Sequence, residues 1–216
     1  MELEFIDWGL IPYKVALHKQ LELVEKVFAE NLPGYLIFCH HPPIVTLGRA
    51  TKDGDVFDWN GPVIEVSRGG RATYHGPSQQ VVYPIINLNY QRKGRIAHEV
   101  QGYLRVLEEA IVLTLQEFGI QSTGKSLQKK EDDSKSDETG VWIGARKIAS
   151  LGIAVKNWVT YHGAAINIEH DVRAFKGINP CGLSAATMTD MEQVLGFSPD
   201  REAFSRKLKS VLCEVL

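Results

Sequence analysis

The 216-residue sequence predicts an α/β protein of the α+β type, in which a mixed β-sheet is flanked by helices. Three apolar patterns with helical spacing are interspersed with short, strongly apolar segments that are typical of strands. These segments do not follow a regular βαβ alternation, which argues against a doubly wound parallel sheet. Because the length suits one core of ordinary size, we expect a single domain over residues 1–216.

The first helical pattern places Leu17, Leu21, Val24 and Phe28 on one stripe, at spacings of four and three residues. It ends in Asn-Leu-Pro-Gly, because proline and glycine both terminate helices. The apolar run that follows is expected to be a buried strand. Cys39 lies inside this run, so we interpret it as a small core residue.

Two further helices are expected in the second half of the chain. One begins near Ile96 and ends before Gly119, which is suited to the position just past a helix. The other has Ser198 as its expected N-cap and Pro199 at its first position. Cys213 falls beside the apolar face of this last helix, and we give it no catalytic role.

Strands are expected between these helices, at residues 62–67, 81–88, 140–155 and 158–169. The last two segments are expected to pair in antiparallel fashion through a turn at Lys156 and Asn157.

A polar segment at residues 121–139 contains one large apolar residue, Leu127, and charges of both signs. Because such a segment cannot bury enough apolar surface to order itself, we expect a mobile surface loop. It is either a tolerated insertion or part of the rim of a site.

Composition narrows the function classes. A formal net charge of −2, without a basic run, gives no indication of nucleic-acid binding. The acidic N-terminal segment does not resemble a secretory signal, and the apolar runs are too short to cross a membrane. The three cysteines lack metal-ligand spacing, so we expect a reduced cytoplasmic protein with free thiols and no metal.

Cys181 is the candidate nucleophile. Pro180 restricts the residue before it to extended backbone, and Gly182 leaves one flank of the sulfur without a side chain, so we expect a presented thiol. A thiol in a reducing compartment becomes a nucleophile when a neighbouring group favours its thiolate form.

Three other segments carry residue types suited to a site. "SRGGRATYHGPSQQ" (67–80) combines adjacent glycines with two arginines, although a plain tight turn would also explain it. "GARKIASLG" holds Lys147, which could equally be an ordinary surface lysine on a strand. "YHGAAIN" holds His162, which, like His75, either orients a substrate or is a hydrogen-bonded structural histidine.

Together these four segments resemble the lipoate-protein ligase B family, the octanoyltransferases that move an octanoyl group from acyl carrier protein to lipoyl domains. The family pattern is approximately RGG-x-x-TYHGPGQ, a GVW segment leading to KIA-x-x-G, then HG-x-A-x-N and PCG. This chain reads RGGRATYHGPSQ, GVWIGARKIASLG, HGAAIN and NPCG, and the match extends to HPPIVTLGR at residues 41–49. The resemblance implies the catalytic core shared by biotin-protein and lipoate-protein ligases.

The resemblance also implies roles for individual residues. Cys181 corresponds to the nucleophile that carries the acyl group as a thioester, and Lys147 to its partner. The implied substrate-binding residues are Arg68, Gly69, Gly70, Arg71, Ala72, Thr73, Tyr74, His75, Ser150, Leu151, Gly152, His162, Gly163, Ala164 and Ala165. The implied partners are octanoyl-acyl carrier protein as donor, and as acceptors the lipoyl domains of 2-oxoacid dehydrogenases and the glycine cleavage H protein. A monomer without a cofactor is expected.

The chain departs from the family pattern at a few positions. Ser78 stands where glycine is usual, which puts the backbone geometry of that turn in doubt. Ala164 and Ile166 replace the larger residue and leucine of the usual HGFALN, so we hypothesise a pocket that tolerates chains longer than octanoyl. The segment 121–139 is also longer than is usual in the family.

A cysteine paired with a lysine suits acyl transfer between thioesters, because cysteine is both a good nucleophile and a good leaving group. An ammonium about 4 Å from the sulfur would favour the thiolate by about 4 kcal/mol at an effective dielectric constant near 20. Backbone N–H groups of Cys181, of Gly182 or of the RGG segment are the expected oxyanion donors. No nucleotide is needed, and the sequence has no phosphate-binding GxxxxGK[ST] loop.

Three alternatives stay open. An ATP-dependent lipoate or biotin ligase on the same core would activate a free acid and would not need Cys181. A non-catalytic acyl-binding or carrier-docking protein would show no turnover, and a cysteine hydrolase would release free octanoate without an acceptor.

Overall fold

A computed structural model describes residues 3–90, 97–125 and 139–216. Its main sheet has seven strands in the order β1-β2-β6-β10-β9-β8-β7. β1 and β2 pair in parallel and the other neighbours are antiparallel, so the sheet is mixed. In that order the strands are β1 (Glu4–Leu10), β2 (Gly34–His40), β6 (Gln79–Ile86), β10 (Val159–Asn167), β9 (Arg146–Lys156), β8 (Gly140–Ile143) and β7 (Thr123–Gly124).

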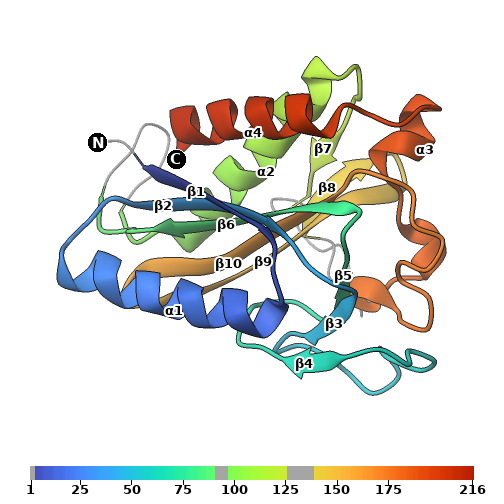
Figure 1. Cartoon of the computed structure of the whole chain (residues 1–216), viewed down its shortest axis with the longest axis horizontal. Coiled ribbons are helices and arrows are strands. Elements are labelled where there is room, and N and C mark those ends of the chain that lie inside the picture. The colour runs from blue at the N-terminus through green and yellow to red at the C-terminus, as the bar shows by residue number, and fades with distance from the viewer. Residues whose placement is uncertain (1–2, 91–96, 126–138) are drawn as a thin grey trace.

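Helices cover both faces of this sheet (Figure 1), as the sequence predicts. The long helices are α1 (Tyr13–Ala29) on one face, and α2 (Val100–Glu117) and α4 (Arg201–Val215) on the other. The short elements are helix α3 (Met191–Leu195) and two 3₁₀ turns, η1 (Pro180–Gly182) and η2 (Ala185–Thr187). A second, three-stranded sheet lies at one end of α1, with strand order β4 (Val63–Glu65), β3 (Ile44–Leu47) and β5 (Thr73–His75).

The predicted apolar stripe of α1 is wrong in part. Val24 is buried, but Phe28 is 52% exposed, and Leu17 and Leu21 are only partly buried. The face against the sheet instead includes Ala16, Val27 and the polar Gln20. Gln20 is buried because its side-chain oxygen accepts the backbone N–H of His162 in β10. A pattern built on large apolar residues alone therefore misjudges the orientation of this helix.

The other two long helices form in the regions that the sequence predicts. α2 ends before Gly119, which has φ +77° in the left-handed region as expected for that position. α2 begins at Val100, whereas the predicted start, Ile96, lies outside the described residues. The predicted cap of α4 is wrong: Asp200, not Ser198, accepts the N–H of Ala203 at 2.9 Å.

The expected strand at residues 140–155 is in fact a hairpin. β8 and β9 are two strands that turn at Gly144, which has φ +57°. β9 then turns through Asn157 and Trp158 into β10, so their predicted antiparallel pairing is confirmed. Within the polar segment, Thr123 and Gly124 form β7; most of the loop expected at 121–139 lies outside the described residues.

The short β8 leaves part of β9 available to another segment. β8 pairs with β9 only up to Ser150, and beyond it the N–H of Gly69 donates to Ile153 O at 2.9 Å. The RGG segment is thereby fixed against the middle of the sheet. In the described ranges, none of the helices has the length and apolar character that a membrane crossing requires.

The packing of α4 on α2 gives a test of the fold. Phe204 is fully buried, and its ring centroid lies 5.5 Å from that of Phe118. We expect Phe204→Ala to lower the free energy of unfolding by about 3–5 kcal/mol, because the cavity left behind cannot collapse fully. The exposed Phe28 is the matched control, and Phe28→Ala is expected to cost less than about 1 kcal/mol. Urea unfolding measures both, and equal losses would contradict the packing described.

Candidate functional site

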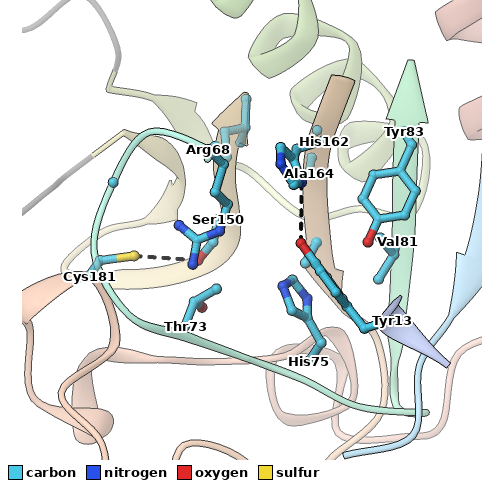
Figure 2. A pocket seen from close by; sticks show the side chains of 15 residues that line it. Tyr13, Arg68, Thr73, His75, Val81, Tyr83, Ser150, His162, Ala164 and Cys181 are labelled. Atoms are coloured by element: carbon cyan, nitrogen blue, oxygen red, sulfur yellow. Dashed lines mark hydrogen bonds between the residues drawn. The ribbon is translucent and has the colours of Figure 1, made fainter. Parts of the chain in front are cut away.

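A cavity of about 420 Å³, including its open mouth, lies between the centre of the main sheet and the small sheet (Figure 2). Its lining combines small and apolar side chains with a few polar ones, which is typical of small-molecule pockets. The lining residues are Tyr13, Arg68, Gly70, Thr73, His75, Val81, Tyr83, Ser150, Leu151, Gly152, His162, Gly163, Ala164, Ala165 and Cys181.

Cys181 lies at one side of this cavity, in the turn η1. Its backbone has φ +56° and ψ +20°, a left-handed conformation that residues other than glycine rarely adopt. The backbone N–H donates to Ala72 O at 2.8 Å, and Sγ lies 4.0 Å from Ser150 Oγ. The side chain is only 6% exposed, so the thiol is presented to the cavity and not to bulk solvent.

An ion pair supports the turn from the other side. A Cβ on Gly182, which has φ +76°, would overlap the guanidinium of Arg71. Arg71 in turn forms a two-point ion pair with the buried Asp55, with Nε donating to Oδ2 at 2.9 Å. The backbone oxygen of Asp55 also accepts the N–H of Asn179 at 2.8 Å. Arg71 and Asp55 therefore hold the chain on both sides of Cys181.

Arg68 gives the cavity a positively charged wall. Its guanidinium donates to Thr46 O at 2.9 Å, to Thr46 Oγ1 at 2.7 Å and to Gly69 O at 3.0 Å, all of them uncharged acceptors. Nε has no hydrogen-bond partner among the described residues, although Arg68 is only 6% exposed. Gly152 leaves room for this side chain, because a Cβ there would lie 3.2 Å from Arg68 Cδ.

Two buried histidines form part of the polar wall. His162 Nδ1 lies 3.2 Å from the hydroxyl of Tyr13, and His75 Nε2 lies 3.4 Å from Thr46 Oγ1. Burial lowers the pKa of His162 to about 3, with a smaller contribution from Arg68. Burial, with the charges of His41 and Arg68, holds the pKa of His75 well below its usual value. Both rings are therefore neutral at pH 7.

Lys147 is fully buried on β9, which excludes the alternative of a surface lysine. Its ammonium lies 5.7 Å from the ring centroid of Trp142. A Cβ on Gly140 would lie 2.6 Å from Lys147 Cε, and Gly140 pairs with Ser150 across the sheet. The lysine side chain therefore extends along the sheet toward the level of Ser150, whose hydroxyl faces Cys181.

Most of the residues predicted for the site line the cavity; the others are Gly69, Arg71, Ala72, Tyr74 and Lys147. Gly69 and Ala72 contribute backbone hydrogen bonds to the surrounding structure. Tyr74 points away because side chains alternate along β5, and its hydroxyl donates to Asp171 at 3.1 Å.

The sequence reasoning missed three lining residues, Tyr13, Val81 and Tyr83. Val81 and Tyr83 share one face of β6, so the alternation of a strand offered a signal for them. Tyr13 is at the first turn of α1, and its position at the cavity depends on how that helix crosses the sheet.

Three of the backbone donors expected for an oxyanion are already engaged. The N–H groups of Cys181, Gly182 and Gly69 donate to the carbonyls of Ala72, Asn179 and Ile153 at 2.8–2.9 Å. In this conformation these three groups are not available to a substrate. Among the described residues, no group of three or more His, Cys, Asp or Glu side chains is placed to hold a metal ion.

The two other cysteines do not line the cavity. Cys39 is completely buried in β2, and burial raises its pKa, so it behaves as the core residue expected. Cys213 is exposed on α4.

The sequence and the fold match those of known proteins. Residues 12–213 match the model of the lipoyl protein ligase A/B catalytic domain. An octanoyltransferase from Bdellovibrio bacteriovorus is 54% identical over 100% of this chain and 99% of its own length. An octanoyltransferase from Geobacter metallireducens is 37% identical, with coverages of 88% and 82%.

Solved structures show the same fold at low identity. Lipoate-protein ligase A bound with ATP superimposes with a TM-score of 0.68 at 17% identity, covering 98% of this chain and 86% of that one. Biotin protein ligase from Aquifex aeolicus, in complex with biotin and ATP, gives a TM-score of 0.55 at 12% identity, with coverages of 98% and 69%.

The chain therefore belongs to the lipoyl protein ligase A/B catalytic domain family. The family and the fold expected from the four sequence motifs are confirmed.

The neutral, buried His162 gives a test by pH. The unfolded chain protonates this histidine below about pH 6.5, whereas the folded protein does not until about pH 3. The contribution of His162 to the free energy of unfolding is therefore fully present above pH 6.5. It falls by about 1.4 kcal/mol per pH unit as the pH decreases toward 3. We expect His162→Gln to flatten the pH dependence of the free energy of unfolding, measured in urea between pH 7 and pH 4.

The matched control is His18, whose side chain is 76% exposed on α1, and His162→Gln is expected to flatten the pH dependence more than His18→Gln does. An unchanged slope in His162→Gln would show that this ring is not buried in its neutral form.

Proposed function

We propose that the protein is an octanoyltransferase that carries the acyl group as a thioester on Cys181. The observation that carries the proposal is a thiol held in a left-handed turn and presented to a cavity of about 420 Å³. The relatives of known name confirm the expected class of activity, octanoyl transfer by an enzyme. The covalent intermediate and the donor are our inference.

In the first half-reaction, the Cys181 thiolate attacks the carbonyl carbon of an octanoyl thioester on acyl carrier protein. The bond between that carbon and the carrier sulfur breaks, and the ammonium of Lys147 gives its proton to the departing thiolate. Arg68 lies in the same cavity wall as Cys181, so its charge favours the anion that develops on the carbonyl oxygen. The products are octanoyl-Cys181 and the free carrier.

In the second half-reaction, the amine of a lipoyl-domain lysine attacks the acyl-enzyme. Lys147, now neutral, accepts the amine proton, and the Cys181 thiolate leaves as the amide forms. The apolar walls of Val81, Leu151 and Ala164 hold the acyl chain during both steps. Because a thioester is converted into a more stable amide, the reaction needs no ATP.

The proposed acceptors, localisation and oligomeric state follow from the resemblance to the octanoyltransferase family. The acceptors are the lipoyl domains of 2-oxoacid dehydrogenases and of the glycine cleavage H protein, and lipoyl is a second acyl group that the enzyme transfers. The enzyme acts as a cytoplasmic monomer. The likeness to the ATP-bound ligase concerns the fold, since that structure shares only 17% identity with this chain.

Intact-protein mass spectrometry tests the covalent step. Incubation with octanoyl-acyl carrier protein, without ATP, is expected to add one octanoyl group to the wild type and none to Cys181→Ala. Lys147→Ala is expected to slow acylation by a factor of about 10²–10⁴, because the proton transfer is lost. Cys213→Ala, which removes an exposed thiol, is the control and should acylate normally.

Two results would contradict this proposal. Turnover retained in Cys181→Ala and dependent on ATP would indicate a ligase that activates a free acid. Release of octanoate without an acceptor would indicate a hydrolase.

Chain length gives a second test. Ala164 lines the cavity, and its side chain is smaller than the residue usual in the family, so we expect activity to persist on carriers loaded with ten or twelve carbons. Ala164→Leu is expected to lower the rate with these longer chains more than with octanoyl, which serves as the internal reference. A sharp loss of wild-type activity beyond eight carbons would show that Ala164 adds no usable space.

A further inference from the structure

Glu108 is a buried carboxylate outside the cavity described above. It is 4% exposed on α2, on a helix face that otherwise buries the apolar residues Leu107, Ile111 and Leu115. Acidic residues are rarely buried unless they are paired or hydrogen-bonded, because leaving water is costly for a charge. Glu108 therefore needs a hydrogen-bond or ion-pair partner at this buried position.

Two glycines on neighbouring strands make room for this carboxylate. The N–H of Gly140, in β8, donates to Glu108 Oε1 at 2.8 Å. On the adjacent strand β7, a Cβ on Gly124 would lie 2.7 Å from Glu108 Oε2. The two strands are joined there, since the N–H of Lys125 donates to Gly140 O at 3.1 Å. Glu108 thus fixes the start of β8.

Lys147 contacts the same glycine. A Cβ on Gly140 would lie 2.6 Å from Lys147 Cε and would overlap the backbone oxygen of Ala149. Gly140 also has φ +145°, a conformation that side chains rarely allow. Gly140, which has no side chain, therefore lies against both the buried Glu108 and the buried Lys147. The path of the lysine depends on where the Gly140 backbone is held.

This contact lies at the level of the thiol. Gly140 pairs with Ser150 in the β8–β9 ladder, and Ser150 Oγ lies 4.0 Å from Cys181 Sγ. A chain of contacts thus runs from α2 to the cavity, through Glu108, Gly140 and then Lys147 or Ser150.

We propose that Glu108 is a positioning residue, which holds the Gly140 backbone so that Lys147 extends toward Cys181. Glu108 acts through Gly140 and touches neither the acyl chain nor the thiol. The inference rests on the proposed role of Lys147, and it adds a residue on a helix behind the sheet to the machinery of acyl transfer.

A double-mutant cycle on the reactivity of Cys181 tests this role. The rate of iodoacetamide alkylation at Cys181 is followed by peptide-resolved mass spectrometry, which separates it from Cys39 and Cys213. We expect Glu108→Ala to slow alkylation about tenfold when Lys147 is present and to have little effect in a Lys147→Ala background. Glu108→Gln keeps an oxygen for the Gly140 N–H and is expected to recover most of the rate.

The neighbouring, exposed Glu109 provides the control, and Glu109→Ala is expected to alkylate like the wild type. If Glu108→Ala does not fold, as judged by circular dichroism, Glu108→Asp carries the same cycle, because its shorter side chain withdraws the carboxylate from Gly140.

Equal slowing in both backgrounds would show a purely structural Glu108 and overturn this inference alone. Alkylation that is unchanged by Lys147→Ala itself would overturn the proposed cysteine–lysine pair and this inference with it.

Discussion

The left-handed turn at Cys181 is the constraint on which the rest of the site depends. Such a conformation costs of the order of 1–3 kcal/mol for a residue with a side chain, so the surroundings must enforce it. The Ala72 carbonyl holds the Cys181 N–H, and the Arg71–Asp55 pair lies against the backbone of Gly182. With the turn held on both sides, the thiol faces the cavity.

The cavity has largely apolar walls, and Arg68 is the one permanently charged side chain among the residues that line it. Arg68 is buried in the wall with uncharged acceptors, whereas burial keeps His75 and His162 neutral at pH 7. Because charge is costly inside a protein, a lining with one cation and neutral rings suits the apolar chain that we propose binds there. Arg68 and Cys181 line the same cavity, and in the proposed mechanism negative charge develops beside this thiol during transfer.

Local patterns predicted the mixed sheet and most elements, because strand and glycine signals lie close together in sequence. The cavity residues within the motifs were predicted from the resemblance to a known family. They could not predict contacts between distant segments. The pairing of Arg71 with Asp55 and the place of Tyr13 at the cavity depend on how elements pack. The buried face of α1 was mispredicted because it includes the polar Gln20, whose hydrogen-bond partner is a backbone N–H in the distant strand β10. Likewise the burial of Lys147 depends on the space left by a glycine in β8.

The central claim is that the thioester on Cys181 is the species that passes the acyl group to the acceptor. Octanoyl-enzyme freed of donor can be mixed with a lipoyl domain in a single-turnover, rapid-quench experiment. We expect the acyl group to move from Cys181 to the acceptor lysine at least as fast as steady-state turnover. An acyl-enzyme that hydrolyses, or that transfers its acyl group more slowly than turnover, would contradict it.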